Sequence, residues 1–282
     1  MRQILVTGAT GTVGRQVVSQ LLATDVRVRA LTRDPDSANV PNGVDVRRGD
    51  LTQPETLDAC LDGVDVVFLV WTADPRAVSK AIEQIARYAR QIVFLSSPHQ
   101  TPHPLFQQPN PLATMHAEIE RLIQASDLDW TFLRPGMFAA NARSWWAPQI
   151  RAGDVVRWPY AEALTAPIHE ADIAAVAVSA LLDTRHNNAD YVLTGPQSLT
   201  QREQVEIIGD VIGRSLRFEE ISPEEARQEL GFPLPAVNML LNAWAAAIGH
   251  PAYVTNTVEE VTGNPARTFR EWVFDHVEEF RI

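Results

Sequence analysis

Three glycines near the start of the chain have the spacing of a phosphate-binding turn. They stand as G-x-x-G-x-x-G, directly after an apolar run and directly before a helical stretch. In such a turn the first glycine allows a tight bend, the second lets a pyrophosphate approach the backbone, and the third lets the helix pack closely on the strand. The amide groups at the helix start then face the phosphates, and the alternative is a glycine turn kept only for packing. The residues expected to contact a dinucleotide are Gly8, Thr10, Gly11, Thr12, Val13 and Gly14.

A basic residue ends the second strand-like run, which closes with Leu31-Thr32-Arg33. Chains that bind NAD usually carry an acidic residue there for the ribose 2′-hydroxyl group. A guanidinium group instead binds a phosphate through two donors, so Arg33 favours NADPH over NADH. The alternative is a solvated surface arginine whose aliphatic stem covers the sheet edge. The acidic Asp34, which follows directly, also leaves the choice of cofactor open.

The third strand-like run ends in Arg-Arg-Gly-Asp-Leu, which places Asp50 and Leu51 near the same edge of the sheet. The Asp50 carboxylate could accept a hydrogen bond from an adenine amino group, with Leu51 against the ring face. Aspartate is equally ordinary at a strand-to-helix turn, so both interpretations stand.

These residues lie at the ends of alternating strands and helices. Strands are predicted over 4–7, 26–32, 44–48, 64–70, 92–96 and 130–134, and helices over 13–23, 54–61, 75–89 and 111–125. The alternation predicts an α/β fold with a doubly wound, parallel, Rossmann-type sheet. Thr52 and Glu55 have the spacing of a capping box, and Asn110 is expected to cap a helix that starts with Pro111.

The pattern changes after residue 136. A helix over 170–182 leads to a strand over 190–193, so the segments near 165–195 return to the sheet. A helix over 200–212, a short strand near 216–219 and three further helical stretches follow. We therefore expect a dinucleotide-binding domain over residues 1–135 and a smaller, mostly helical substrate lobe over 136–282.

The composition excludes several classes of protein. The 282 residues include 24 basic and 35 acidic side chains, a net charge of −11 that disfavours non-specific binding of nucleic acid. Cys60 is the single cysteine, so no disulfide framework, cysteine-based zinc site or other metal site is expected. No signal peptide is visible, and the apolar centre of the charge-free stretch 231–258 is too short to cross a membrane, so it is expected to be a buried helix. We expect a cytoplasmic monomer or homodimer without membrane or nucleic-acid partners.

A set of motifs, found in one order along the chain, resembles a known family. The motifs are TGATGTVG, Thr-Arg-Asp after the second run, Gly-Asp-Leu after the third, FLSS, HAEIE, WTFLRPG, IHEADIA and TGNPARTF. Over essentially the whole chain they resemble the NmrA-like branch of the atypical short-chain dehydrogenases. That family includes NADPH-dependent reductases of quinones, triphenylmethane dyes, azo compounds and ketones, and redox sensors that bind the dinucleotide without turning it over.

The resemblance implies which residues surround the nicotinamide. Two segments should flank the ring, and a third, after the fourth strand, should pass near the ribose. These residues are Ser96, Ser97, Pro135, Gly136, Met137 and Phe138 at the ring, with Trp71 and Thr72 near the ribose.

The proton-transfer pair of most short-chain dehydrogenases is absent. In that pair, Tyr-x-x-x-Lys, the lysine lowers the pKa of the tyrosine and the tyrosine transfers a proton to the carbonyl group. The chain has one lysine, Lys80, and no tyrosine is followed by lysine four positions later. By resemblance, the equivalent positions are Leu112 and His116.

His116 is the candidate catalytic residue. On a helix that starts at Pro111, residues 112, 115, 116, 119, 122 and 123 form one stripe, so His116 is expected to point inward, towards the nicotinamide. Glu120, one turn later, could hold the imidazole in one tautomer. The imidazole could bond the cofactor or pass a proton to a reduced substrate; alternatively it is a core histidine satisfied by Glu120 or the backbone. Without acid catalysis, positioning can support hydride transfer and solvent can protonate the product.

Aromatic residues after position 136 predict the wall of an apolar cleft between the strand ends and the second lobe. They suit a flat, hydrophobic, aromatic substrate, and the alternative is that the tryptophans seal the two lobes together. His103 lies in a proline-rich loop that could border the cleft, whereas His169 and Asp172 are expected to start and anchor their helix. The expected substrate contacts are His99, Met137, Asn141, Trp145, Trp146 and Trp158, with Phe138 and Tyr160 nearby.

The sequence therefore predicts an NADPH-dependent oxidoreductase that transfers hydride to a hydrophobic quinone, ketone or related conjugated acceptor. The alternative is an NADP(H)-binding redox sensor with little or no turnover. An isomerase or epimerase is disfavoured, because the sugar-nucleotide enzymes of this superfamily usually rely on the same missing tyrosine and lysine.

Overall fold

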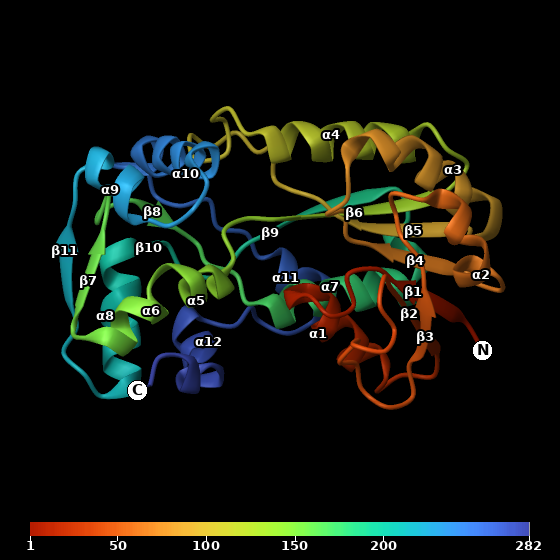
Figure 1. Ribbon diagram of the computed structural model, residues 1–282, viewed down its shortest axis with the longest axis horizontal. Coiled ribbons are helices and arrows are strands. Elements are labelled where there is room, and N and C mark those ends of the chain that lie inside the picture. The colour runs from red at the N-terminus through yellow and green to blue at the C-terminus, as the bar shows by residue number, and fades with distance from the viewer. Residues whose placement is uncertain (282) are drawn as a thin grey trace.

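Seven parallel strands form one sheet in the order β3-β2-β1-β4-β5-β6-β9. A computed structural model describes residues 1–281 (Figure 1). The strands are β1 (Gln3–Val6), β2 (Arg27–Thr32), β3 (Asp45–Arg48), β4 (Val66–Leu69), β5 (Gln91–Leu95), β6 (Asp129–Pro135) and β9 (Ala189–Leu193). The predicted Rossmann-type α/β fold is confirmed, and β9 returns to the sheet as expected.

The sheet is buried on both faces. In β1, Ile4 and Val6 belong to the core beneath α1 and α7, whereas Leu5 belongs to the core on the opposite face. Successive side chains of a strand point to opposite faces, so a sheet covered on both sides needs strands that are apolar throughout. Figure 1 shows α1 and α7 on one face and α3 and α4 on the other. The helices beside the sheet are α1 (Thr12–Leu21), α2 (Asp58–Leu61), α3 (Val78–Tyr88), α4 (Pro111–Gln124), α7 (Glu170–Leu182) and α11 (Thr257–Thr262).

One of the two predicted helix caps is wrong. The segment before α2 begins as a 3₁₀ turn, Pro54–Thr56, and Gln53 at its N-cap makes no side-chain bond. Thr52 instead donates its N–H and its hydroxyl group to Asp50 Oδ1, each at 2.8 Å, because it lies within the turn that Asp50 closes. The Asn110 cap is confirmed, since its side-chain oxygen accepts the first amides of α4.

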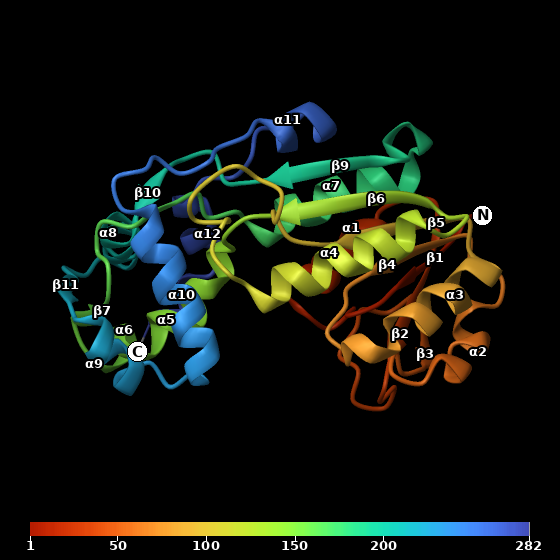
Figure 2. The same cartoon turned by 90° about the horizontal axis from the view of Figure 1, so that it is seen from above.

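A second hydrophobic core lies beyond the carboxyl ends of the strands (Figures 1 and 2). Its helices are α5 (Ala142–Trp145), α6 (Ala147–Ala152), α8 (Gln201–Ile212), α9 (Pro223–Glu229), α10 (Leu234–Ala247) and α12 (Phe269–Asp275). Two short strand pairs complete it: β7 (Val155–Trp158) with β11 (Arg217–Glu220), and β8 (Leu164–Thr165) with β10 (Leu199–Thr200). The sequence did not predict β7, β8 or β10, and four α-helices rather than three follow β11 within residues 1–281.

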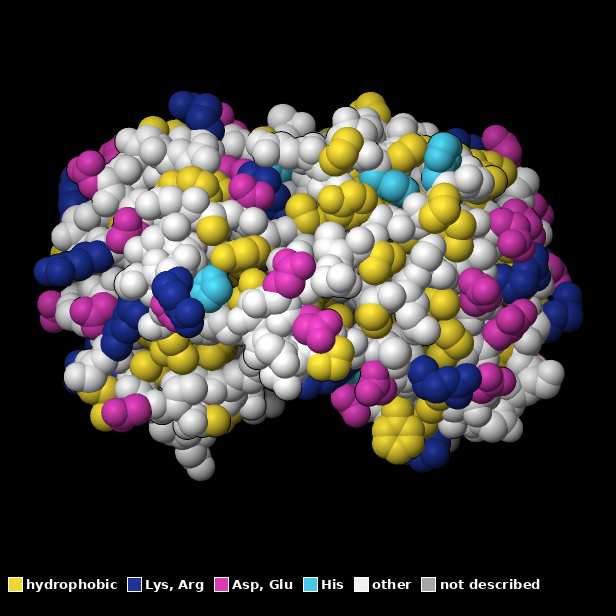
Figure 3. All heavy atoms as spheres, turned by 180° about the vertical axis from the view of Figure 1, so that it is seen from behind, with side chains coloured by type: hydrophobic (Ala, Val, Ile, Leu, Met, Phe, Trp, Pro, Cys, Tyr) yellow, Lys and Arg dark blue, Asp and Glu magenta, His cyan; other side chains and the backbone are white. Residues whose placement is uncertain are grey.

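No helix within residues 1–281 has the length and apolar character to cross a membrane. Figure 3 shows acidic and basic side chains distributed together over the back of the molecule.

The start of α7 joins the sheet to the second core. His169 caps this helix by accepting the Ala171 N–H at 3.0 Å, and Asp172 accepts the Arg267 N–H at 2.7 Å, so the predicted anchoring roles of both residues are confirmed. Between them, the buried Glu170 carboxylate accepts hydrogen bonds from Arg143 and from the Trp272 indole, each at 2.8 Å.

Glu170 is also 3.3 Å from the Nε2 atom of His276. Burial opposes ionisation of both groups, but their mutual hydrogen bond and attraction, together with backbone hydrogen bonds and, for Glu170, the charges of His169 and Arg143, outweigh it. The pKa of Glu170 falls to about 2, and the pKa of His276 rises above its usual 6.5. The stabilisation from Glu170 is present above pH 4.5 and is lost as the pH falls towards 2. The stabilisation from His276 is complete below pH 6.5 and is lost as the pH rises through its folded-state pKa.

We expect Glu170→Gln to lower the free energy of unfolding by about 2–3 kcal/mol, because it leaves Arg143 and His276 without their carboxylate. Denaturant unfolding at about pH 5.5 measures the loss, which should shrink as the pH rises through the folded-state pKa of His276, because the wild-type imidazole then loses its charge. The matched control is Glu279→Gln, which removes the exposed partner of Arg143 and should cost less than about 1 kcal/mol. Equal losses in the two variants would contradict the role of the buried carboxylate.

Candidate active site

The glycine turn between β1 and α1 brings two stretches of backbone into contact. Gly8 has φ +60°, and its carbonyl oxygen accepts the Gly11 N–H at 2.9 Å. A Cβ atom on Gly14 would lie 2.1 Å from that same carbonyl oxygen, so α1 approaches the turn as closely as only glycine allows. Thr7 fixes the turn to the sheet, since its Oγ1 accepts the N–H of Val70 at 2.7 Å.

The start of α1 also presents amide donors suited to an anion. Gly11 caps the helix without a side-chain hydrogen bond, and the first turn contains no Asp or Glu. Thr10 and Thr12 are exposed beside these amides, while Val13 is buried in the core. The turn therefore serves packing and also offers the donors that a pyrophosphate needs, so its residues fit a dinucleotide.

Arg33 and Asp50 follow β2 and β3 at the same edge. Arg33 is exposed and forms no ion pair with any residue among 1–281, whereas Leu51 is buried. Hydrogen bonds from Thr52 lower the pKa of Asp50, and the positive charge of Arg33 lowers it further. The role of Asp50 in the turn explains its Oδ1 atom, which accepts both hydrogen bonds from Thr52. No described residue donates a hydrogen bond to its Oδ2 atom.

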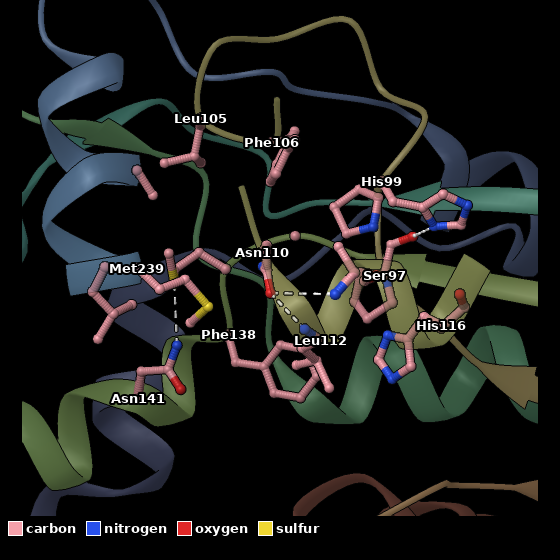
Figure 4. Close-up of a pocket in the computed structure, with 18 of the residues that line it drawn as sticks. Ser97, His99, Leu105, Phe106, Asn110, Leu112, His116, Phe138, Asn141 and Met239 are labelled. Atoms are coloured by element: carbon pink, nitrogen blue, oxygen red, sulfur yellow. Dashed lines mark hydrogen bonds between the residues drawn. The ribbon is translucent and has the colours of Figure 1, made fainter. Parts of the chain in front are cut away.

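A cavity of 540 Å³ lies at the carboxyl ends of β4, β5 and β6. Its wall comes from the segments that follow these strands, the loop 98–110, the start of α4, and α10 (Figure 4). Ligands of open parallel sheets bind at this edge. The predicted site residues in the wall are Trp71, Thr72, Ser96, Ser97, His99, His116, Pro135, Met137, Phe138, Asn141 and Trp145.

Two buried polar atoms of the cavity wall have no hydrogen-bond partner in the described chain. They are Ser97 Oγ and His116 Nδ1. Buried polar groups in native proteins nearly always have a partner, so each exception needs an explanation. A polar group of a bound ligand supplies one, and this end of the cavity therefore fits a nicotinamide amide group or an acceptor carbonyl.

His116 is a neutral imidazole at physiological pH. Burial lowers its pKa to about 4, although the charge of Glu120 opposes the shift. Its ring packs edge-on against Phe94, with 5.6 Å between the ring centroids. The expectation that α4 turns His116 inward is confirmed, but a core histidine with all its hydrogen bonds made does not match the unpaired Nδ1 atom.

The expected bond between Glu120 and His116 is wrong. Glu120 accepts instead from Arg134, at 2.9 Å to Nε and 2.6 Å to Nη2, and from Ser96 Oγ at 2.6 Å. A guanidinium group binds both carboxylate oxygens at once, which an imidazole cannot do. The Ser96 hydroxyl is therefore held by Glu120, and Ser97 is the serine whose hydroxyl remains unpaired.

The two histidines of loop 98–110 occupy different places. His99 lines the cavity, with its Nδ1 atom 3.0 Å from the Ser97 carbonyl oxygen and its Nε2 atom 3.5 Å from Glu120. His103 is absent from the wall, because its Nε2 atom bonds the Pro251 carbonyl oxygen at 2.9 Å. In the part of the chain that the structure describes, no cluster of His, Cys, Asp and Glu could hold a metal ion.

The structure brings only one of the three predicted tryptophans to the cavity. Trp145 is in the wall, whereas Trp146 and Trp158 are each 1% exposed in the second core, where they pack against each other and Trp158 also packs against Trp244. The placement of Trp146 and Trp158 at the substrate is therefore wrong. The sequence correctly predicts that these large apolar side chains are buried, but they are buried in the core of the second lobe and not against a ligand.

Sequence reasoning missed the contribution of α10 and of loop 98–110. The charge-free stretch was expected to form a buried helix, yet α10 has two apolar stripes. One stripe, Val237, Leu241, Trp244 and Ala247, enters the second core. The other faces the cavity, together with two loop residues: Ala236, Met239, Leu240 and Ala243 of α10, with Leu105 and Phe106. The available signal is that the apolar residues of α10 cover more of its circumference than one core-facing stripe needs, with Asn238 and Asn242 on the exposed side.

A family model described as NAD(P)H-binding matches residues 8–184 of the chain. The (4-alkanoyl-5-oxo-2,5-dihydrofuran-3-yl)methyl phosphate reductase of Streptomyces griseus is 40% identical over 98% of this chain and 99% of its own length. NAD(P)H azoreductase of Xenophilus azovorans is 36% identical over the same two shares. The chain belongs to the NAD(P)H-binding family. The resemblance to the NmrA-like atypical short-chain dehydrogenases is thereby confirmed, and the protein is an NAD(P)H-dependent reductase.

The fold of this NAD(P)H-binding reductase is shared with a solved relative. The Escherichia coli NADPH-dependent quinone oxidoreductase, crystallised with NADPH, has a TM-score of 0.83 and 24% identity, covering 98% of this chain and 99% of that one. At this level of identity the likeness extends to the fold.

None of the four tyrosines lies in the wall of the reductase's cavity, as far as residues 1–281 show. Lys80 is exposed on α3 and is likewise absent from the wall. The polar groups available at the reductase's cavity are therefore serine, asparagine, threonine and histidine side chains.

We expect Gly14→Ala to weaken NADPH binding at least tenfold, because the new Cβ atom must displace the Gly8 carbonyl and the amides beside it. Equilibrium titration of NADPH fluorescence measures the change. Gly153→Ala is the matched control, since a Cβ atom there meets nothing within 4 Å. Unchanged affinity in Gly14→Ala would show that the turn does not hold the dinucleotide.

Proposed function

We propose that the protein transfers hydride from NADPH to a hydrophobic quinone, ketone or related conjugated acceptor without a Tyr-x-x-x-Lys pair. The observation that carries the proposal is the cavity, whose wall is largely apolar and holds two buried, unpaired polar atoms, Ser97 Oγ and His116 Nδ1. Apolar walls with few polar groups are typical of sites for flat hydrophobic ligands. The azoreductase and dihydrofuranone reductase relatives support reduction of conjugated compounds.

The choice of NADPH rests on Arg33. Its exposed guanidinium group follows β2, where the 2′-phosphate is expected, and it has no carboxylate partner among residues 1–281. In the same proposal, residues 1–135 with the returning segment 165–195 bind the cofactor, and the rest of the chain covers the acceptor.

Ser97 and His116 position the reactants. When bound, NADPH supplies the hydride. The Ser97 hydroxyl and the His116 Nδ1 atom complete their hydrogen bonds on the nicotinamide or on the acceptor carbonyl. With its pKa near 4, His116 carries no extra proton to release at neutral pH, so solvent protonates the product. His116 thus binds and orients rather than acting as an acid.

The alternative is a redox sensor that binds NADP(H) with little or no turnover. The observation in its favour is that no tyrosine, lysine or carboxylic acid of the described chain lines the cavity, so the usual proton donor of the short-chain dehydrogenases is missing there. Loss of NADPH absorbance, measured against a panel of quinones, ketones and dyes, separates the two functions. Turnover of any acceptor supports the reductase, and tight NADPH binding with no turnover of the panel supports the sensor.

We expect Arg33→Ala to lower the affinity for NADPH about 10- to 100-fold while changing that for NADH less than threefold, because one charge-assisted phosphate contact is lost. Calorimetric titration of both cofactors measures this. Arg47→Ala removes a neighbouring arginine that is already paired with Asp45, and it should change neither affinity. Equal losses for both cofactors in Arg33→Ala would refute the assignment.

We expect His116→Phe to lower kcat/KM at least tenfold, because the Nδ1 contact is lost while the packing on Phe94 remains. His116→Asn should restore most of the activity, since its amide nitrogen can take the place of Nδ1. The pH profile of kcat between about pH 5.5 and 8.5 should keep its shape in His116→Asn. A limb that disappears in this variant would instead identify His116 as the acid.

A further inference from the structure

The described cavity wall offers a ligand no unpaired charge. Of the described residues that line it, none is Asp, Glu, Lys or Arg, and His116 is neutral because burial lowers its pKa to about 4. His99 directs its Nδ1 atom at the Ser97 carbonyl oxygen and its Nε2 atom at Glu120, so any positive charge on His99 is already paired with the Glu120 carboxylate.

The charged residues next to the wall are occupied by partners of opposite sign. Arg134, which precedes Pro135, is held by Glu120 and Asp190, at 2.6 and 2.8 Å. Arg143, between Asn141 and Trp145, is held by Glu170 and Glu279, at 2.8 and 2.9 Å. An ionic group of a ligand would therefore lose its hydration in the cavity without gaining a counter-charge, which disfavours its binding.

The two buried, unpaired polar atoms and the apolar side chains of α10 lie on opposite sides of the cavity. Figure 4 shows Met239 of α10 across the cavity from Ser97 and His116. The cavity-facing stripe of α10 is Ala236, Met239, Leu240 and Ala243, in which a flexible thioether and a leucine stand between two small residues. Met239 and Leu240 are only partly buried, whereas Val237, Leu241, Trp244 and Ala247 of the same helix are buried in the second core, so an apolar ligand would complete the burial of Met239 and Leu240.

We propose that the acceptor is an uncharged conjugated carbonyl compound with an extended apolar chain that lies along α10. This inference rests on the proposed function for the identity of the head group, and it adds the charge and the tail. It separates this chain from its relative in Streptomyces griseus, which is named for a phosphate ester. A dianionic phosphate within this cavity would meet no free cation from the described chain.

The test measures binding rather than turnover. Protein loaded with NADP⁺ is titrated with 2-alkyl-1,4-naphthoquinones that carry one, four or eight carbons, and Trp145 in the wall reports binding by fluorescence quenching. A fourth probe carries an eight-carbon chain that ends in a hydroxyl group, and a fifth carries its phosphate monoester. We expect affinity to rise by up to roughly fourfold per buried methylene group. We also expect the alcohol to bind at least tenfold more tightly than the phosphate.

Two variants of α10 place a lysine at a position that faces the cavity and at a position that is exposed. Met239→Lys introduces a cation into the cavity and should improve binding of the phosphate probe at least tenfold while weakening the alkyl probes. Asn242→Lys adds the same charge at an exposed position of the same helix and should change each affinity less than twofold. Because the wild-type series stands without either variant, misfolding of Met239→Lys does not remove the test.

The inference is overturned if the wild-type protein binds the phosphate as tightly as the alcohol. It is also overturned if chain length does not change the affinity, or if Asn242→Lys changes the relative affinities of the probes as much as Met239→Lys does. The proposed function fails separately. If the neutral long-chain probes bind best but consume no NADPH, the reductase proposal is lost and the ligand class stands. If all probes are reduced regardless of their charge or chain length, the reductase proposal stands and the proposed ligand class is lost.

Discussion

A buried ion pair between α4 and β6 decides how the cavity is arranged. Arg134 donates to both carboxylate oxygens of Glu120, and both side chains are almost inaccessible to solvent. A pair of this kind persists when its remaining polar positions are satisfied, and the Ser96 hydroxyl group fills one of them. Since Glu120 holds Ser96, Ser97 is left to face the cavity. Since the pair fixes α4 against the sheet, His116, one turn earlier, reaches the same place.

The parts of this arrangement that the sequence predicts are those set by local rules. Alternating strands and helices predict the sheet, because each element carries its own pattern of burial. Helical spacing from Pro111 also places His116 on the inner face of α4. The partner of Glu120 is different, because Arg134 lies on another element and meets it only after folding. Within α4, His116 is the nearest residue that could bond Glu120. In the folded chain, Arg134 forms this bond instead.

The same limit explains the wrong cap and the two misplaced tryptophans. Thr52 and Glu55 have the spacing of a capping box. The Thr52 hydroxyl group instead bonds Asp50 within the preceding turn, and the following helix starts as a 3₁₀ turn. Trp146 and Trp158 have the size and polarity of cleft residues, and the sequence correctly indicates that they are buried. Which residues bury them depends on the fold, because the second core forms from segments that lie far apart in the chain.

Helix α10 shows why composition cannot separate a core from a ligand site. A stripe that faces packed side chains and a stripe that faces a cavity are both apolar, so the stretch without charges predicts burial on all sides. In the structure, the two stripes differ in how completely they are buried. Val237 and Trp244 are at most 1% exposed, whereas Met239 and Leu240 are only partly buried. Partly buried apolar groups beside unpaired polar atoms are a mismatch that neither solvent nor the rest of the described chain resolves. A molecule with a polar head and an apolar body resolves both, and this requirement ties α10 to Ser97 and His116 in one site.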